Sequence, residues 1–358
     1  MKKRKSIIFI MLSFMIVLIS CDKIGIGKSD KAGLYPIRIG DKEGYIDASG
    51  KIVINPQFDY AGLFKDGMAP IKINDKYGYI DKKGMIVINP QFEYTYGFQE
   101  GLAAFEVSDN FSNYKTGYID KKGNIVIQPQ DGFTYRFSEG LSCVGINEKY
   151  GFINKAGETV IHPQFDRAEN FSEGLAVVGV GKDYDNQKYG FIDKTGKYVI
   201  NPQFDIAWNF SEGLAIVGVG KDYDNRKYGF IDKKGNYVIN PQFDNVGPFR
   251  EGLAAVQVGK EENQKYGFID KTGKYVINPQ FDRIDSFSGG LARVGIGNDY
   301  RNRKYGFIDK SGKYVINPIY EDASSFIEDL APVELNGQFQ YIDKKGKTVW
   351  TGDSPYFF

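Results

Sequence analysis

The chain has 358 residues, of which 25% are charged and 15% aromatic, and it contains 43 Gly, 25 Tyr and 27 Phe. This charged fraction is typical of a folded domain and argues against disorder, whereas many aromatics and glycines together indicate short strands and tight turns. Residues 1–20 hold four of the 46 basic residues and no acid, so the remainder has 42 bases against 45 acids. That balance disfavours nucleic-acid binding, which needs a basic surface to displace counterions.

The N-terminus has the pattern of a signal peptide. Basic residues at positions 2–5 precede an apolar run over 6–19. That run is shorter than the ~20 residues that a membrane-spanning helix needs. Its end, Leu18-Ile19-Ser20-Cys21, resembles a bacterial lipobox, although an uncleaved anchor helix or a conventional signal peptide with a chance Cys are alternatives. The resemblance implies cleavage after residue 20, acylation of Cys21, a flexible tether over 21–33, and a lipid-anchored protein of the bacterial cell envelope.

The rest of the chain is one unit repeated. A block of the form Tyr-Gly-Phe-Ile-Asp-Lys-x-Gly-x-x-Val-Ile-Asn-Pro-Gln-Phe recurs at spacings of 34–39 residues. Its first glycine falls at Gly44, Gly78, Gly117, Gly151, Gly190, Gly229, Gly267 and Gly306, and a degraded ninth copy has Gln340 in that place. A lone unit of this length buries too little surface to fold, so each must pack its apolar residues against its neighbours.

One copy begins with a predicted hairpin. Residues 189–193 alternate between two faces, which predicts a strand. The sequence Asp193-Lys194-Thr195-Gly196 follows, with an acid that can accept backbone N–H bonds and a glycine that can take positive φ. These residues predict a type I turn followed by a bulge.

The same copy continues with two further predicted strands. Residues 197–201 form the return strand, which Pro202 is expected to end because it has no N–H. Residues 203–205 are a candidate short outer strand. After a turn over 210–213, residues 214–219 form the third main strand.

We therefore expect residues 34–358 to form an all-β tandem array of about nine three-stranded antiparallel units. The array could wind as an open superhelix or close like a β-propeller. Closure usually splits one unit between the two termini. Here both terminal units look complete, since Leu34-Tyr35-Pro36-Ile37 begins the first and Leu330-Ala331-Pro332-Val333 the last. This favours the open array, with the end copies as caps.

The repeated residues resemble the bacterial WG-repeat family, over roughly residues 34–350. Tyr189-Gly190-Phe191-Ile192-Asp193 stands for its Trp-Gly core, and Asn201-Pro202-Gln203-Phe204 for its Pro-Pro segment. The departure is systematic, because Tyr replaces the signature Trp in most copies and Glu43, Thr116 and Phe339 replace it in others. The resemblance implies a β-repeat architecture and a binding role, and it implies no catalytic residues.

The composition offers little for catalysis or metal binding. The single histidine, His162, stands where other copies have Asn, and Cys143 stands where the next copy has Val. We interpret both as repeat variants, with Cys143 a small core residue. Nucleophile–base pairs that use His, and His/Cys metal clusters, are therefore excluded, and we expect no cofactor.

The loop before the Tyr-Gly strand differs between copies and is the predicted ligand site. Its long versions carry an aromatic residue flanked by acids and amides, and insertions in a repeat array often gather on the binding face. An aromatic in this setting could stack on a sugar ring or anchor a protein, whereas a calcium loop would need another spacing. The candidate ligand-binding residues are Tyr184, Tyr223, Tyr300, Phe111, Asp183 and Asp222.

These features predict a non-catalytic binding or adhesion module that is held at the envelope by lipid and recognises a protein or glycan. The alternative is a structural scaffold subunit of an envelope complex. An enzyme would concentrate its chemistry in one site, whereas the turn aspartates and the other recurrent polar residues are spread evenly over the copies.

Overall fold

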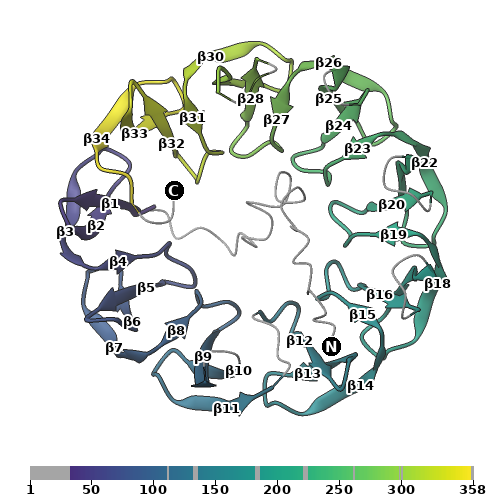
Figure 1. The fold of residues 1–358 in the computed structure, drawn as a ribbon, viewed down its shortest axis with the longest axis horizontal. Helices are drawn as coiled ribbons and strands as arrows, with labels where there is room; N and C mark the ends of the chain where they lie inside the picture. The colour runs from purple at the N-terminus through teal and green to yellow at the C-terminus, as the bar shows by residue number, and fades with distance from the viewer. Residues whose placement is uncertain are drawn as a thin grey trace, which may run out of the picture.

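The computed structural model describes residues 33–110, 113–131, 136–181, 186–220, 225–260, 263–297, 299 and 301–355. These residues form nine small antiparallel sheets arranged in a closed ring, so the fold is a nine-bladed β-propeller (Figure 1). The all-β prediction and the propeller alternative are confirmed. The signal peptide, Cys21 and the tether up to residue 32 lie outside the described residues.

Strands occupy four successive positions from the ring centre outward (Figure 1). The inner strands are β4 (Tyr60–Ala61), β8 (Tyr94–Thr95), β15 (Arg167–Ala168), β19 (Ile206–Ala207), β23 (Asn245–Val246), β27 (Arg283–Ile284) and β31 (Asp322–Ala323). The second strands are β1 (Tyr35–Ile39), β5 (Met68–Ile73), β9 (Leu102–Asn110), β12 (Leu141–Ile146), β16 (Ala176–Val180), β20 (Ala215–Val219), β24 (Ala254–Val258), β28 (Ala292–Ile296) and β32 (Leu330–Leu335).

The third strands carry the Tyr-Gly motif or its variants, and every outer strand except the last carries the proline of the Pro-Gln-Phe motif. The third strands are β2 (Lys42–Ile46), β6 (Lys76–Asp81), β10 (Asn113–Asp120), β13 (Lys149–Asn154), β17 (Lys188–Ile192), β21 (Lys227–Ile231), β25 (Lys265–Ile269), β29 (Lys304–Ile308) and β33 (Gln338–Asp343). The outer strands are β3 (Ile52–Phe58), β7 (Ile86–Phe92), β11 (Ile125–Gln130), β14 (Thr159–Phe165), β18 (Tyr198–Phe204), β22 (Tyr237–Phe243), β26 (Tyr275–Phe281), β30 (Tyr314–Tyr320) and β34 (Thr348–Gly352).

We number the blades 1 to 9 in chain order. Blades 1 and 4 are three-stranded in the described residues, as β1–β3 and β12–β14, and the other seven have four strands. The predicted number of units is therefore correct. Most blades, however, have a two-residue inner strand in addition to the three predicted strands.

The ring closes through blade 1, so the open array favoured from the sequence is wrong. Asp353, directly after β34, forms an antiparallel bridge with Arg38 of β1. Tyr60 holds the same position beside Lys72 in blade 2. The C-terminal segment thus takes the place of the inner strand of blade 1. Because residues 350–353 carry no repeat motif, the first unit looked complete in sequence, and the terminal copies pack on each other instead of acting as caps.

The outer strands differ from the prediction at the proline. β18 continues through Pro202 to Phe204, so Pro202 does not end it and residues 203–205 form no separate strand. Pairing with β17 shifts register beyond the Phe191–Ile200 pair, so the proline lies in a bulge at the sheet edge, where its missing donor costs no ladder bond. The bulge also explains Gly190, because a Cβ there would collide with the Ile200 carbonyl oxygen and the Pro202 nitrogen.

The predicted turn after the third strand is confirmed. The Asp193 carboxylate accepts bonds from the backbone nitrogens of Thr195 (2.9 Å) and Lys197 (3.1 Å). Gly196 has φ of 86°, a conformation that other residues adopt only with strain. The recurring aspartates therefore organise hairpins, as the sequence indicated.

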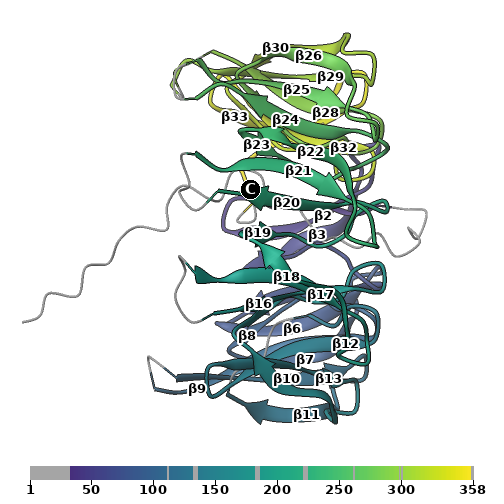
Figure 2. The same ribbon diagram turned by 90° about the vertical axis from the view of Figure 1, so that its right-hand side faces the viewer.

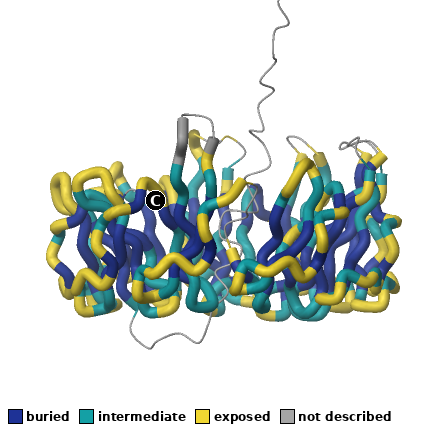
Figure 3. Tube along the Cα trace, turned by 90° about the horizontal axis from the view of Figure 1, so that it is seen from below, coloured by how far each residue is buried: buried dark blue, intermediate teal, exposed yellow. Residues whose placement is uncertain are grey.

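The core lies between adjacent blades, which confirms that neighbouring units share it. One cluster joins Leu175, Phe191 and Ile200 of blade 5 to Phe210 and Ile231 of blade 6, all of them buried. Each such side chain stabilises the fold by ~1.5–3 kcal/mol. In Figure 3 the buried residues form a continuous band between the two faces of the ring.

An aromatic pair crosses every blade junction. Eight of the pairs have ring centroids 4.7–5.0 Å apart, and they are Tyr45–Phe64, Tyr79–Phe98, Tyr118–Phe137, Phe152–Phe171, Phe191–Phe210, Phe230–Phe249, Phe268–Phe287 and Phe307–Phe326. The ninth, Tyr35–Tyr341, joins blades 9 and 1 at 5.8 Å. The Tyr341 hydroxyl also donates to the Pro36 carbonyl across this junction (2.9 Å).

We predict that Tyr341→Phe lowers the free energy of unfolding by about 1–2 kcal/mol, because it removes a buried hydrogen bond that closes the ring. Chemical denaturation measures this. The control is Tyr314→Phe, whose hydroxyl makes no hydrogen bond among the described residues and whose loss should cost less than about 0.5 kcal/mol. Equal stability of the two variants would mean that blades 1 and 9 are not held together in solution.

Candidate binding face

The two faces of the ring carry different connections. The hairpins between second and third strands project from one face, here called the hairpin face, and the turns that flank the second and outer strands lie on the opposite turn face (Figure 2). The charged residues of the two faces make different contacts.

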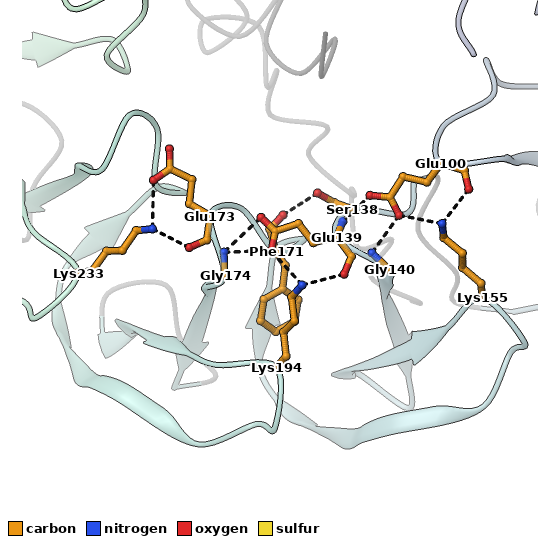
Figure 4. Close-up of polar contacts among 10 residues, drawn as sticks. All are labelled: Glu100, Ser138, Glu139, Gly140, Lys155, Phe171, Glu173, Gly174, Lys194 and Lys233. Carbon is orange, nitrogen blue, oxygen red and sulfur yellow. Dashed lines mark hydrogen bonds and ion pairs between the residues drawn. The ribbon is translucent and has the colours of Figure 1, made fainter. Parts of the chain in front are cut away.

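On the turn face, recurrent glutamates tie each blade to the next. The Glu139 carboxylate of blade 4 accepts the Gly174 amide of blade 5 (3.0 Å) and pairs with Lys194 (3.2 Å), which also donates to the Glu139 carbonyl (2.9 Å) (Figure 4). The same pattern holds for Glu100, Glu173, Glu212 and Glu251 with the following blade. These glutamates have φ of 51–55°, a strained conformation, so their backbone is held by the contact. We conclude that this ring of charge is structural.

On the hairpin face, an acid after each outer strand holds the base of the next hairpin. Asp205 pairs with Lys188 of its own blade (2.5 Å) and accepts the Gly220 amide of blade 6 (2.8 Å). Arg226 then donates to the Gly220 carbonyl from the other side of the hairpin (3.0 Å). Asp166 and Asp282 repeat this arrangement at Gly181 and Gly297. The bases of the long hairpins in blades 5, 6 and 8 are therefore fixed in the same way.

The predicted ligand-binding residues lie outside the described residues, so their role stays a prediction. They are Tyr184, Tyr223, Tyr300, Phe111, Asp183 and Asp222.

The inner strands differ between blades at two positions. These are the first residue of the strand and the residue that directly follows the strand. The first position is Tyr60, Tyr94, Arg167, Ile206, Asn245, Arg283 or Asp322, whereas the second residue of the strand is small or aliphatic in every case but Thr95. Alternation along a strand places the varied residues on one side. A ring that repeats its structural residues and varies these positions presents a different surface at each blade.

Four tyrosines gather on this varied surface at blades 2 and 3, and we call them the tyrosine cluster. Tyr60, Tyr77, Tyr94 and Tyr96 form a chain of ring contacts with centroids 5.8, 5.5 and 5.0 Å apart. Tyr60, Lys72 and Tyr77 lie in one row across the sheet of blade 2, next to the short hairpin at 74–75. Tyr94 is 43% exposed, so the cluster reaches solvent at the hairpin face.

Charged groups border the tyrosine cluster. The Lys72 ammonium lies 5.8 Å from the Tyr77 ring centroid, and the Tyr96 hydroxyl donates to the Glu106 carboxylate (2.8 Å). Burial, followed by the nearby phenols of Tyr77 and Tyr94, raises the pKa of Tyr60 to about 12. The Tyr60 phenol therefore remains a neutral donor at physiological pH. Lys72 also pairs with Asp75 (2.8 Å).

A buried carboxylate binds the backbone next to the tyrosine cluster. Glu43, which replaces the signature aromatic in blade 1, has no exposed surface and accepts the Ala61 amide next to Tyr60 (2.6 Å). Sequence reasoning missed both Glu43 and the tyrosine cluster as site residues. The available signal was the contrast between the repeated Pro-Gln-Phe motif and the variable residues that follow it, as in Asp59-Tyr60-Ala61 and Glu93-Tyr94-Thr95-Tyr96.

The remaining sequence candidates for chemistry lie elsewhere. Cys143 is buried in the core between blades 4 and 5, as predicted, and burial, then the Glu169 carboxylate, raises the pKa of its thiol to about 12. His162 is exposed on outer strand β14. Within the described ranges no group of three or more His, Cys, Asp or Glu residues could hold a metal ion, and no helix is long and apolar enough to cross a membrane.

Comparison with protein families gives one match. The family described as WG containing repeat matches the segments 44–77, 77–111, 117–150, 150–184, 189–223, 228–261, 266–300 and 305–339. Each segment runs from the Tyr-Gly motif to the start of the next copy. No curated protein matches this chain.

Several solved structures resemble the ring. The uncharacterized protein lmo1340 from Listeria monocytogenes EGD-e is 11% identical, with a TM-score of 0.43, and the match covers 84% of this chain and 95% of that one. Hsv2p from Kluyveromyces lactis is 10% identical, with a TM-score of 0.41 and coverage of 69% and 92%. Prolyl oligopeptidase B from Galerina marginata is 10% identical, with a TM-score of 0.44 and coverage of 81% and 56%. Likeness at this level carries no argument about function.

We predict that acid weakens the ring through the hairpin-face aspartates. Burial opposes ionisation of Asp205 and Asp282, but bonds from Lys188 and Lys265 and from the Gly220 and Gly297 amides outweigh it and hold both pKa values below the usual range. A carboxyl with a lowered folded-state pKa stabilises the native state fully above the unfolded value of about 4 and loses that contribution as pH falls.

The melting temperature should therefore fall between pH 6 and pH 3, and thermal melts followed by circular dichroism measure it. The double variant Asp205→Asn, Asp282→Asn should start lower at pH 6 and fall less. A variant that loses as much on acidification as the native protein would contradict this assignment.

Proposed function

We propose, from the premise that this chain belongs to the WG containing repeat family, that it is a non-catalytic binding module whose ligand contacts the hairpin face. The tyrosine cluster is the observation that carries this proposal. Four phenol rings, one of them 43% exposed, lie beside a lysine and a glutamate, next to inner-strand positions that vary from blade to blade among the described residues. Such a surface is suited to recognition, whereas the recurrent charges serve the fold.

The chemistry of the cluster favours a glycan or a protein segment as ligand. A phenol presents an apolar ring face for stacking and a hydroxyl for hydrogen bonds, and it loses little conformational freedom on binding. Lys72 and Glu106 add one donor and one acceptor of fixed sign at the border. The ring contacts within the cluster restrain the side chains before a ligand arrives, which lowers the entropic cost of binding.

A scaffold role in an envelope complex is the second candidate. It is supported by the closed ring, whose blades are linked by glutamate–lysine ion pairs on the turn face and by amide–aspartate hydrogen bonds on the hairpin face. A scaffold predicts fixed partners that co-purify in constant ratio and no soluble ligand. A binding module predicts saturable exchange with a ligand, so titration distinguishes the two.

We further propose that the mature chain is held at the cell envelope by acylation of Cys21. The support is the signal-like N-terminus and the resemblance to a lipobox. Two or more acyl chains anchor a protein durably, since each buried CH₂ contributes ~0.8 kcal/mol.

The anchor predicts a shift in fractionation. With Cys21→Ser, the intact mass should lack acyl groups and the protein should no longer float with membrane vesicles that have been washed at high salt. Cys143→Ser is the matched control, because its thiol is buried in the core. Equal flotation of the two variants would rule out the anchor.

The tyrosine cluster is tested by binding to immobilised glycan and peptide arrays. Tyr60→Ala with Tyr94→Ala should weaken the strongest signal at least ~10-fold, because a stacked aromatic in a binding site typically contributes more than 1 kcal/mol. The control is Tyr237→Ala with Tyr275→Ala, which removes two exposed tyrosines from the outer strands β22 and β26. If both pairs weaken binding alike, or neither does, the cluster is not the ligand site.

The hairpin tips provide the second test of the same face. Replacing Tyr184, Tyr223 and Tyr300 together with Ala should weaken binding and leave the melting temperature unchanged, because the hairpin bases are fixed independently by Asp166, Asp205 and Asp282. Unchanged affinity would restrict the ligand to the tyrosine cluster and remove the tips from the proposal.

A further inference from the structure

The outer edge of blades 1 to 3 carries an uninterrupted set of exposed aliphatic side chains, here called the aliphatic rim. It consists of the first two residues of three outer strands, Ile52 and Val53 on β3, Ile86 and Val87 on β7, and Ile125 and Val126 on β11, all of them exposed. Met85, directly before β7, adds a side chain that is 64% exposed. The strands that carry these residues, β3, β7 and β11, follow one another along the outer edge of the ring (Figure 1).

The other blades repeat only the second of these positions, where the exposed valines are Val160, Val199, Val238, Val276 and Val315. In blades 5 to 8 the first outer position is a tyrosine, and its ring packs on the outer phenylalanine of the preceding blade at 6.1–6.2 Å. In blade 4 it is Thr159, and in blade 9 it is Thr348. Three successive blades with an exposed isoleucine beside the valine, where the other blades have tyrosine or threonine, indicate a contact surface.

The outer edge of these blades is not suited to bind a partner by adding a β-strand. Each of the three outer strands carries a proline, Pro56, Pro90 or Pro129, and pairs with its neighbour through a shifted register. A proline and a bulge interrupt the row of donors and acceptors that an added strand would need. The rim therefore offers apolar side chains and no continuous ladder.

We propose that the aliphatic rim lies against the surface of a lipid bilayer, so that the ring stands on its edge at the membrane. This inference rests on the lipid anchor at Cys21 proposed above. Eleven residues separate Cys21 from Gly33, which begins the described chain just before blade 1, and such a segment spans at most about 40 Å. The acyl chains are thus confined near blade 1, and the two blades that follow it carry the rest of the rim.

The charges around the rim agree with a lipid surface. β3, β7 and β11 contain no acidic residue, and the exposed lysines Lys51, Lys83 and Lys122 stand one to three residues before them. The acids of these turns, Asp47, Asp81 and Asp120, accept hydrogen bonds from the turn backbone. Aliphatic side chains can enter the boundary between headgroups and acyl chains while the lysines contact anionic headgroups. In this orientation the hairpin face is perpendicular to the membrane and stays open to a ligand.

A polarity-sensitive dye on single introduced cysteines tests the orientation. Ile86→Cys places the dye on the rim, and Val238→Cys places it on the outer strand of blade 6, one position further along the repeat. The two native side chains are 45% and 43% exposed. Cys143 is buried with a raised thiol pKa, and an acylated Cys21 has no free thiol, so the introduced cysteine takes the label. The full-length lipidated protein is reconstituted in vesicles of phosphatidylethanolamine and phosphatidylglycerol that contain a quencher confined to the acyl region.

We expect the dye at position 86 to shift to the blue and to be quenched roughly twofold more than the dye at position 238, as an apolar face that enters the acyl boundary should be. If the two dyes are quenched equally in a protein that floats with the vesicles, the rim does not contact the membrane, whereas the proposed anchor is unaffected. A blue shift without quenching would identify a protein cover and also overturn it.

The intact mass separates failure of the anchor from failure of the rim. If the mass shows no acyl group, the anchor is wrong, and flotation of the same protein with these vesicles then tests the rim alone. The double variant Ile86→Asn, Val87→Asn should then abolish flotation, and the double variant Val199→Asn, Val238→Asn should preserve it. This result would still support contact between the rim and the membrane. No flotation of the unmodified protein would overturn it.

Discussion

The aromatic pair at each blade junction is the contact on which the rest of the structure depends. A phenylalanine or tyrosine of the third strand meets the phenylalanine that precedes the next Ser-Glu-Gly turn, as in Phe191 and Phe210 at 4.9 Å. Neither ring can be buried within its own blade, because the core clusters join residues of two adjacent blades. Folding of one unit therefore requires its neighbour, and at the last junction Tyr35 and Tyr341 meet the same requirement by closing the ring.

Closure explains residues that oppose local preference. Glutamate is unfavourable at positive φ, yet six copies place it there, where asparagine or glycine would be easier. In five of them the carboxylate accepts an amide of the following blade and pairs with a lysine of that blade, so contacts between units offset the local strain. Blade 2 has Asp66 in this place, and blade 8 has Gly289, where Lys344 pairs with Asp329 instead. Contacts between blades therefore explain these residues better than the local conformational preference of each residue does.

The difference between structure formed within one blade and contacts between blades also decides what could be predicted from the sequence. Alternation over residues 189–193 and the turn chemistry of Asp193 and Gly196 are local, so the strands and hairpins were predicted correctly. Closure is not local: it depends on Asp353 meeting Arg38, and the segment that brings it there has no repeat motif. The strand through Pro202 was misjudged because a bulge at a sheet edge tolerates a proline that a central strand would exclude. The tyrosine cluster was missed because its members come from two blades that meet only in the folded ring.

In a ring of near-identical blades, binding specificity can arise only where the blades differ. The inner strands change from Tyr60 and Tyr94 to Arg167 and Asp322, and the outer strands change from Ile86 and Ile125 to Tyr237 and Tyr275, while the residues between them repeat. Both departures fall on blades 2 and 3, one at the centre of the ring and one at its edge. Because those blades follow the N-terminal segment, the asymmetry lies near the chain end that carries Cys21. The shared framework thus leaves the proposed contacts with a ligand and with a membrane to a few side chains that differ between the blades.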